Sequence, residues 1–197
     1  MMVAKKVAIQ TLPSDHQRGF IMCGIVGLFL KDEALQPDLG RMLTTMLVTM
    51  TDRGPDSAGI AIYGEEKRGH AKLVVQSQSP KKDFAGLPEA FQKHIGVAPE
   101  MTVKDTHAVL SLPSEHFAVA RAALSEINPS LRTMSRGETI EIYKEVGLPK
   151  DVAARFDLAA MSGTHGIGHT RMATESAVTT MGAHPFNTGE DQCLVHN

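Results

Sequence analysis

The residue best suited to chemistry is Cys23, which directly follows Met22 and opens the run CGIVG. A cysteine that becomes the first residue of a mature chain carries a thiol and a free α-amine together. Such a nucleophile brings its own base. The alternative is a buried structural cysteine at the start of an apolar strand, because free cysteine is among the most buried residue types. On this pentapeptide alone, the structural alternative is favoured.

The composition narrows the class of protein. A chain of 197 residues predicts one domain, and a net charge of −2 gives no basic field for nucleic acid or an anionic membrane. The two cysteines, Cys23 and Cys193, do not make a disulfide scaffold and suit a reducing compartment. The longest apolar run is far too short to span a membrane. We therefore expect a cytoplasmic protein that binds neither nucleic acid nor membrane.

Residues 1–22 require separate treatment, because they lack the apolar segment of a secretory signal. They are either a propeptide that is removed to expose Cys23 or the result of a misassigned start, with Met22 as the true initiator. We favour the second interpretation, because removal of an initiator methionine would leave Cys23 first. The domain is then expected over residues 23–197.

Hydrophobic periodicity predicts the elements around the candidate nucleophile. Residues 23–30 form a near-continuous apolar run, which predicts a strand buried on both faces. Residues 39–50 carry leucine and methionine at helical spacing, which predicts an amphipathic helix. Residues 52–56 contain Gly-Pro and predict a loop, and residues 57–63 predict a second strand.

The middle of the chain, about residues 65–160, gives weaker signals and contains no recognisable chemistry. It predicts strands at 72–76 and 107–112 and helices at 114–127, 137–146 and 151–158. We interpret this stretch as an insertion between two parts of a catalytic core. A strand is expected again at 164–173, followed by a polar turn at 174–176. Another strand is expected at 192–196, and it stops at Asn197 in mid-pattern, which suggests a chain truncated at its C-terminus.

Four short segments occur together in this order: CGIVG at 23–27, RGPDSAG at 53–59, GHTRMAT at 168–174, and HPF at 184–186 followed by HN at 196–197. The chain thereby resembles class II glutamine amidotransferases, whose domains are N-terminal nucleophile amidohydrolases. The resemblance covers residues 23–63 and 163–197. The opening MCGIVGLFL and EIYK at 141–144 make it most similar to stand-alone amidotransferase subunits related to glutamate synthase, including N-methylglutamate synthase.

The resemblance implies an α+β fold, a four-layer αββα sandwich. It also implies that the Cys23 thiol attacks the side-chain amide of glutamine and forms a thioester, which water hydrolyses to glutamate. The ammonia would pass to a synthase partner. In the resembled subunits that partner is a glutamate-synthase-like protein with flavin and iron–sulfur clusters, so no cofactor is expected in this chain.

The resemblance also assigns residues to the substrate. Arg171 matches the arginine that binds the substrate α-carboxylate, a task that suits its planar fork; a structural ion pair is the alternative. Thr174 matches a position close to the substrate, with a plain turn residue as an equal alternative. Asn197 matches the oxyanion asparagine, with an ordinary turn asparagine as the alternative. The family's second oxyanion donor and the acidic ligand of the substrate α-amine would lie beyond Asn197, so we expect an incomplete site.

Supporting roles are expected for four residues. Arg53 and Asp56 match a loop near the nucleophile, and we interpret them as a buried ion pair that braces its strand; a solvated pair in a simple turn is the alternative. Gly24 follows the nucleophile in the motif. His169 is taken as structural, because the α-amine already supplies a base.

Two other functions remain open. His165, His169, Cys193 and His196 could form a four-ligand zinc site, although a spacing of four along a strand separates two histidines by about 13 Å. The chain could also be a non-catalytic docking or regulatory subunit.

Overall fold

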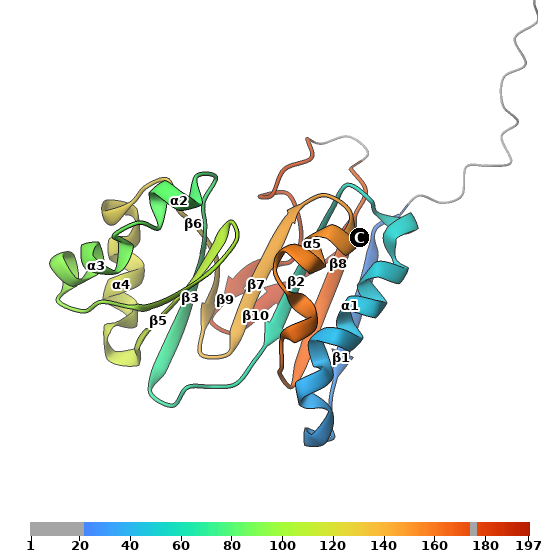
Figure 1. The fold of residues 1–197 in the computed structure, drawn as a ribbon, viewed down its shortest axis with the longest axis horizontal. Helices are drawn as coiled ribbons and strands as arrows, with labels where there is room; N and C mark the ends of the chain where they lie inside the picture. Colours follow the sequence, from blue (N-terminus) through green and yellow to red (C-terminus); the bar gives the residue numbers. More distant parts are fainter. Residues whose placement is uncertain (1–21, 174–176) are drawn as a thin grey trace, which may run out of the picture.

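The structure, a computed structural model, describes residues 22–173 and 177–197 (Figure 1). Within these ranges the strands form two four-stranded antiparallel sheets and a two-stranded hairpin. Sheet A contains, in spatial order, β1 (Gly24–Phe29), β8 (His165–Arg171), β2 (Ser57–Tyr63) and β7 (Ile140–Val146). Sheet B contains β4 (Glu100–Lys104), β5 (His107–Pro113), β3 (His70–Gln76) and β6 (Arg132–Gly137). The hairpin pairs β9 (Phe186–Gly189) with β10 (Gln192–Leu194).

Helices cover the outer sides of the two sheets. The α-helices are α1 (Leu39–Thr49), α2 (Pro80–Asp83), α3 (Leu87–Ile95), α4 (Ser114–Ile127) and α5 (Pro149–Arg155). The 3-10 helices are η2 (Glu33–Asp38), η3 (Thr51–Arg53) and η4 (Leu158–Ala160). Helices α1 and α5 lie beyond sheet A, and α3 and α4 lie beyond sheet B (Figure 1). The fold is mixed α+β with antiparallel sheets, and this layer order is consistent with a sandwich.

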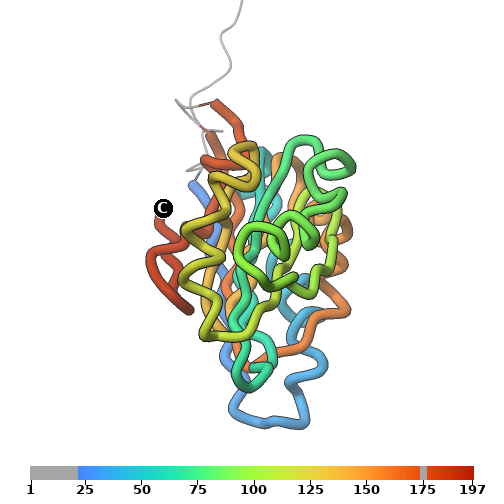
Figure 2. Tube along the Cα trace, turned by 90° about the vertical axis from the view of Figure 1, so that its left-hand side faces the viewer, coloured from blue at the N-terminus to red at the C-terminus, as the bar shows by residue number. Residues whose placement is uncertain are grey.

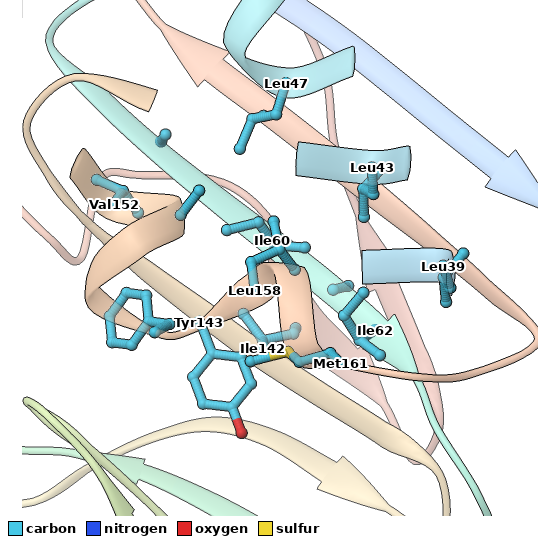
Figure 3. Close-up of a cluster of buried hydrophobic side chains, with 14 of the residues drawn as sticks. Leu39, Leu43, Leu47, Ile60, Ile62, Ile142, Tyr143, Val152, Leu158 and Met161 are labelled. Atoms are coloured by element: carbon cyan, nitrogen blue, oxygen red, sulfur yellow. The ribbon is translucent and has the colours of Figure 1, made fainter. Parts of the chain in front are cut away.

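Helix α1 packs on sheet A through one face, which carries leucines spaced four residues apart (Figure 3). Leu39, Leu43 and Leu47 are fully buried and belong to the same cluster as Ile60 and Ile62 of β2. Strand β8 contributes glycines to this face, and a β-carbon at Gly168 would lie 2.8 Å from Leu47 Cδ1. The small residues therefore let the helix approach the sheet closely.

Sheet B has its own core, on the side of α3 and α4. Its members are buried apolar side chains of β3, β5 and the two helices, among them Leu73, Val75, Leu110, Phe91 and Phe117. Val74, the neighbour with opposite parity, belongs instead to the cluster of sheet A. The alternation along β3 thus directs its two faces to different cores.

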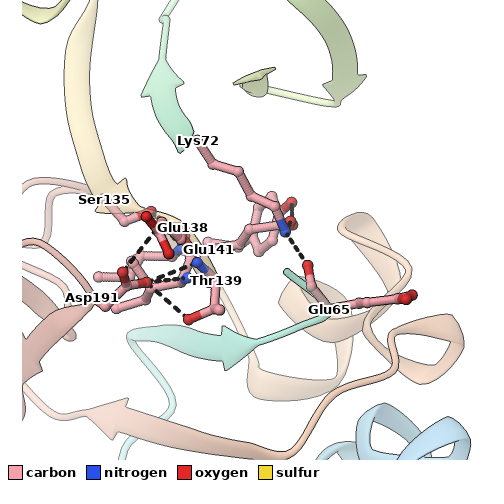
Figure 4. A network of polar contacts seen from close by, with 10 residues as sticks. Glu65, Lys72, Ser135, Glu138, Thr139, Glu141 and Asp191 are labelled. Carbon is pink, nitrogen blue, oxygen red and sulfur yellow. Dashed lines mark hydrogen bonds and ion pairs between the residues drawn. The ribbon is translucent and has the colours of Figure 1, made fainter. Parts of the chain in front are cut away.

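Asp191, in the turn of the β9–β10 hairpin, fastens the hairpin to the β6–β7 turn (Figure 4). Its carboxylate accepts hydrogen bonds from the backbone N–H groups of Glu138, Thr139 and Ile140 and from the Thr139 hydroxyl. Burial alone would raise the pKa of Asp191, but these donors hold it below its ordinary value. The C-terminal segment is thereby held along one side of the molecule (Figure 2).

Several predicted elements are confirmed. The strand at 57–63 corresponds to β2, the strand at 164–173 to β8, the helix at 39–50 to α1 and the helix at 114–127 to α4. The helix predicted at 137–146 is wrong, because Ile140–Val146 is strand β7, which pairs with β2 along its whole length. The polar turn predicted at 174–176 lies outside the described residues.

The prediction that the first strand is buried on both faces is also wrong. Strand β1 lies at the edge of sheet A, paired only with β8 within the described chain. Ile25 is 42% exposed and Phe29 is 64% exposed, both on the face opposite to α1. No helix in the described ranges is long and apolar enough to cross a membrane.

His107 offers a test of the core by pH. It is fully buried, and burial, followed by the charge of Lys144, lowers its pKa from 6.5 to about 3. Below pH 6.5 the unfolded chain binds a proton at His107 that the folded chain does not bind. The free energy of unfolding therefore decreases as the pH is lowered from 6.5, by at most about 1.4 kcal/mol per pH unit for this one proton.

We expect His107→Phe to flatten this decline between pH 6.5 and pH 4 and to change stability little above pH 7. Urea unfolding followed at a series of pH values measures the slope. An unchanged slope in the variant would show that His107 does not couple to folding.

Candidate functional site

Cys23 lies immediately before β1, and the register of β1 sets its surroundings. Gly24 pairs with Thr170 in antiparallel β8, so Cys23 lies at the end of β8 where Arg171 and Met172 follow. The Cys23 thiol is half-buried, and its Sγ is 4.0 Å from the carbonyl oxygen of Met172. The nucleophile expected from the sequence is therefore next to the GHTRMAT motif, 149 positions later in the chain.

Gly24 is required by close packing. A β-carbon added there would lie 2.6 Å from Thr170 Oγ1 and 2.8 Å from Met50 Cβ. The Thr170 hydroxyl itself donates a hydrogen bond to the carbonyl of Met50, at the end of α1. The strand that carries Cys23 thus contacts the end of α1 without an intervening side chain.

Arg171 ends β8 opposite Ser57 of β2, and its side chain is half-buried. Its Nη1 donates to the carbonyl oxygen of Ala177 at 3.4 Å. The guanidinium therefore lies along the segment that follows the motif. Thr174, the other expected substrate contact, lies outside the described residues.

Asp56 supports the backbone beside the nucleophile, but without Arg53. Its Oδ2 accepts the N–H of Ala173 at 2.7 Å, and its own N–H donates to the carbonyl of Arg171 at 3.1 Å. The predicted buried ion pair is wrong, because Arg53 is exposed at the end of η3. The carboxylate accepts the backbone N–H of Ala173 instead.

Asn197 reaches the nucleophile from the C-terminal segment. The backbone nitrogen of Cys23 is 3.2 Å from Asn197 Oδ1, a contact between residues 174 positions apart. An N–H group only donates, so the amide of Asn197 must present its oxygen to Cys23. The Nδ2–H groups of Asn197 can then donate hydrogen bonds to other acceptors.

His169 lies under this segment and is buried. Its Nε2 is 3.0 Å from the carbonyl oxygen of His196 and 2.9 Å from Nδ1 of His184. A carbonyl only accepts, so His169 Nε2 carries the proton. Burial lowers the pKa of both His169 and His184 to about 4, so both rings are neutral at pH 7.

The sequence analysis did not identify Lys144 of β7 as part of the candidate site. Its side chain is buried, with a relative exposure of 3%. Its Nζ donates to the carbonyl oxygens of Ala183 at 2.8 Å and Pro185 at 3.1 Å. Burial lowers its pKa to about 8. The signal was the alternation Ile140, Ile142, Lys144, which places the lysine on an inward face once residues 140–146 are recognised as a strand.

The zinc site proposed as an alternative does not form in the described part of the chain. No group of three or more His, Cys, Asp or Glu side chains there is arranged to hold a metal ion. His165 stacks on Tyr63 with ring centroids 3.9 Å apart, and Cys193 contacts the Tyr63 hydroxyl. His169 contacts His184 and the backbone of His196 instead.

Comparison with known proteins finds relatives that are named as glutamine amidotransferases. No protein-family model matches it. Over 176 residues it is 62% identical to the glutamine amidotransferase-like protein GlxB of Rhizobium meliloti, covering 89% of the chain and 58% of that protein. Over 186 residues it is 32% identical to the "Putative glutamine amidotransferase" of Methanothermobacter thermautotrophicus, covering 89% of the chain and 61% of that protein. These similarities support a glutamine amidotransferase domain.

The chain spans about three fifths of the length of these two relatives, 58% and 61%. A shorter match extends over 61 residues to the glutamine–fructose-6-phosphate aminotransferase (isomerizing) of Methanococcus maripaludis, with 36% identity, 30% of the chain and 10% of that protein. The candidate site is built from segments distant in sequence: Cys23, the end of β8 and the residues around Asn197.

We expect Gly24→Ala to destabilise the domain by about 1–3 kcal/mol, because the added methyl overpacks against Thr170 and Met50. Gly27→Ala is the matched control in the same strand, since its β-carbon would approach nothing nearer than Gly166 O at 3.9 Å. Chemical denaturation of both variants measures the difference. Equal stabilities would contradict the close packing at Gly24.

Proposed function

We propose that the chain is a class II glutamine amidotransferase domain, an N-terminal nucleophile hydrolase that splits glutamine into glutamate and ammonia. The observation that carries this proposal is the 3.2 Å contact between Cys23 N and Asn197 Oδ1. It joins the residue expected to be the nucleophile to the residue expected to hold the oxyanion. The names of the relatives support glutamine as the substrate.

The nucleophile requires processing before Cys23. While Met22 is attached, the Cys23 nitrogen is a peptide nitrogen and cannot accept a proton. After removal of residues 1–22 it becomes an α-amine, whose ordinary pKa of about 8 leaves a neutral fraction at pH 7. The amine then takes the thiol proton as sulfur attacks the amide carbon, and it returns that proton to the departing ammonia. Water hydrolyses the thioester, which releases glutamate and restores the thiol.

Asn197 would contact both the Cys23 amine and the oxyanion in this mechanism. Its Oδ1 accepts the hydrogen bond from Cys23 N and thereby orients the amine. The same contact leaves Nδ2–H to donate to the oxygen that becomes negative in the tetrahedral intermediate. One amide side chain thus fixes the distance between the base and the oxyanion site.

Arg171 binds the substrate α-carboxylate through its two-pronged guanidinium. The backbone on either side is held by Asp56, which bonds the Arg171 carbonyl and the Ala173 N–H. Thr174 adds a hydroxyl contact to the substrate. These contacts place the amide carbon against the thiol and supply most of the orientation.

The ammonia passes to a synthase-type partner. One relative is named for glutamine and fructose-6-phosphate together. For this chain we propose a glutamate-synthase-like partner subunit in the cytoplasm, with flavin and iron–sulfur clusters held by that partner.

Glutaminase activity is expected to depend on Cys23. In the full-length protein with Cys23 as its first residue, confirmed by intact mass, Cys23→Ala should abolish glutamate release. Cys193→Ala, on β10, should retain it. A protein that keeps Met22 should be inactive with an intact thiol, because the base is absent. Full activity of Cys23→Ala would refute the mechanism, and no turnover in any form would favour a docking or regulatory role.

Arg171→Lys is expected to raise KM for glutamine by about 30-fold, equivalent to about 2 kcal/mol, because lysine cannot form the paired hydrogen bonds. Steady-state kinetics with glutamine measures the change. Arg121→Lys, on α4 beside Glu190, is the control. If Arg171→Lys lowered kcat alone, with KM unchanged, the arginine would not be the carboxylate clamp.

A further inference from the structure

Three residues form a row across sheet A on the face opposite to α1. Gly59 of β2 pairs with His169 of β8 on one side and with Lys144 of β7 on the other. The backbone of His184 occupies the space over the glycine, because a β-carbon at Gly59 would lie 2.0 Å from His184 O. The absence of a side chain at Gly59 therefore lets the 183–185 segment lie directly on the sheet.

Lys144 holds this segment from one side. Its Nζ donates to the carbonyl oxygens that flank His184, those of Ala183 and Pro185, and lies 4.7 Å from the centroid of the Phe186 ring. The Lys144 side chain is buried. Two hydrogen bonds to neighbouring carbonyls fix the orientation of the backbone that carries the His184 ring.

His184 and His169 continue the contact toward the nucleophile. The neutral His184 Nδ1 accepts from His169 Nε2–H, the proton that also faces the His196 carbonyl. The His184 and His196 rings meet edge to face with centroids 4.4 Å apart. His196 immediately precedes Asn197, whose side chain holds Cys23 N. Lys144, His169 and His184 are buried, whereas His196 and Asn197, at the end of this series of contacts, are exposed.

We propose that Lys144 is a positioning residue of the amidotransferase site, which acts through His184 and His169 to hold the Asn197 amide against Cys23. The proposal rests on the proposed function. Lys144 contacts neither the nucleophile nor its partner. Its effect is on the geometry of the oxyanion site, so it should change kcat and leave the binding of the substrate carboxylate by Arg171 unchanged.

A double-mutant cycle in the full-length protein tests this coupling. Lys144→Met fills similar volume without donors, and Asn197→Ala removes the oxyanion amide. Lys144→Met should lower kcat by about 10-fold or more, with KM for glutamine within about twofold, because a misplaced oxyanion group costs rate. Asn197→Ala should cost about 10²- to 10³-fold. In the Asn197→Ala background, Lys144→Met should cost less than about twofold.

The outcome that overturns the proposal is additivity, in which Lys144→Met lowers kcat by the same factor with or without Asn197. Unchanged kcat in the single variant also overturns it. Lys72→Met is the matched control, since Lys72 of β3 is a largely buried lysine that pairs with Glu141 and donates to the Glu65 carbonyl (Figure 4). It should retain the wild-type kcat. Thermal unfolding of each variant is measured alongside.

A second pair of variants covers the case in which Lys144→Met does not fold. The side-chain amide of His169→Gln can still donate to the His196 carbonyl, whereas His169→Leu cannot. We expect kcat of the glutamine variant to exceed that of the leucine variant by about 10-fold. Equal kcat values would show that the hydrogen bond to His196 does not position the site.

Failure of the inference can be told apart from failure of the proposed function. Turnover that requires Cys23, combined with additive effects of Lys144 and Asn197, would overturn the positioning role alone. Absence of glutaminase turnover in the processed wild-type protein would overturn both.

Discussion

The antiparallel pairing of β8 with both β1 and β2 is the constraint on which the rest depends. Residues of one parity on β8, such as Gly168, present almost no side chain and let α1 pack on the sheet. Residues of the other parity, His169 and Arg171, face the opposite side and carry the polar groups of the site. A single strand therefore satisfies the packing of the core and the placement of Cys23 at once. A shift of one residue in register would exchange these two sets.

The sequence was sufficient to predict those helices and strands whose pattern of side chains is visible locally. The leucines of α1 and the apolar run of β2 create periodicities that persist without the rest of the fold. The error at 137–146 has a physical origin, because the charged residues Glu141, Lys144 and Glu145 make the segment look like a solvated helix. Those charges are satisfied by partners distant in the chain, such as Lys72 for Glu141 and the Ala183 carbonyl for Lys144.

The residue types of the candidate site could be predicted from the sequence, but the hydrogen bonds between them could not. Cys23 and Asn197 were identified from short motifs, but nothing local indicates that the oxygen of the asparagine amide faces the cysteine nitrogen. The expected partner of Asp56 was wrong for the same reason. The backbone N–H of Ala173, just after β8, donates to the carboxylate, and a backbone donor leaves no trace in the residue types.

The separation between β1 and β8 also dictates an order of assembly. Ribosomes deliver Cys23 early, but its neighbours in the sheet, residues 165–171, emerge more than 130 residues later. Contacts that close such long loops form late in folding. Until then the thiol precedes a strand without a partner, beside a helix that can already form. The surroundings that would make Cys23 reactive therefore form among the last events of biosynthesis, so unfinished chains do not carry an assembled site around the thiol.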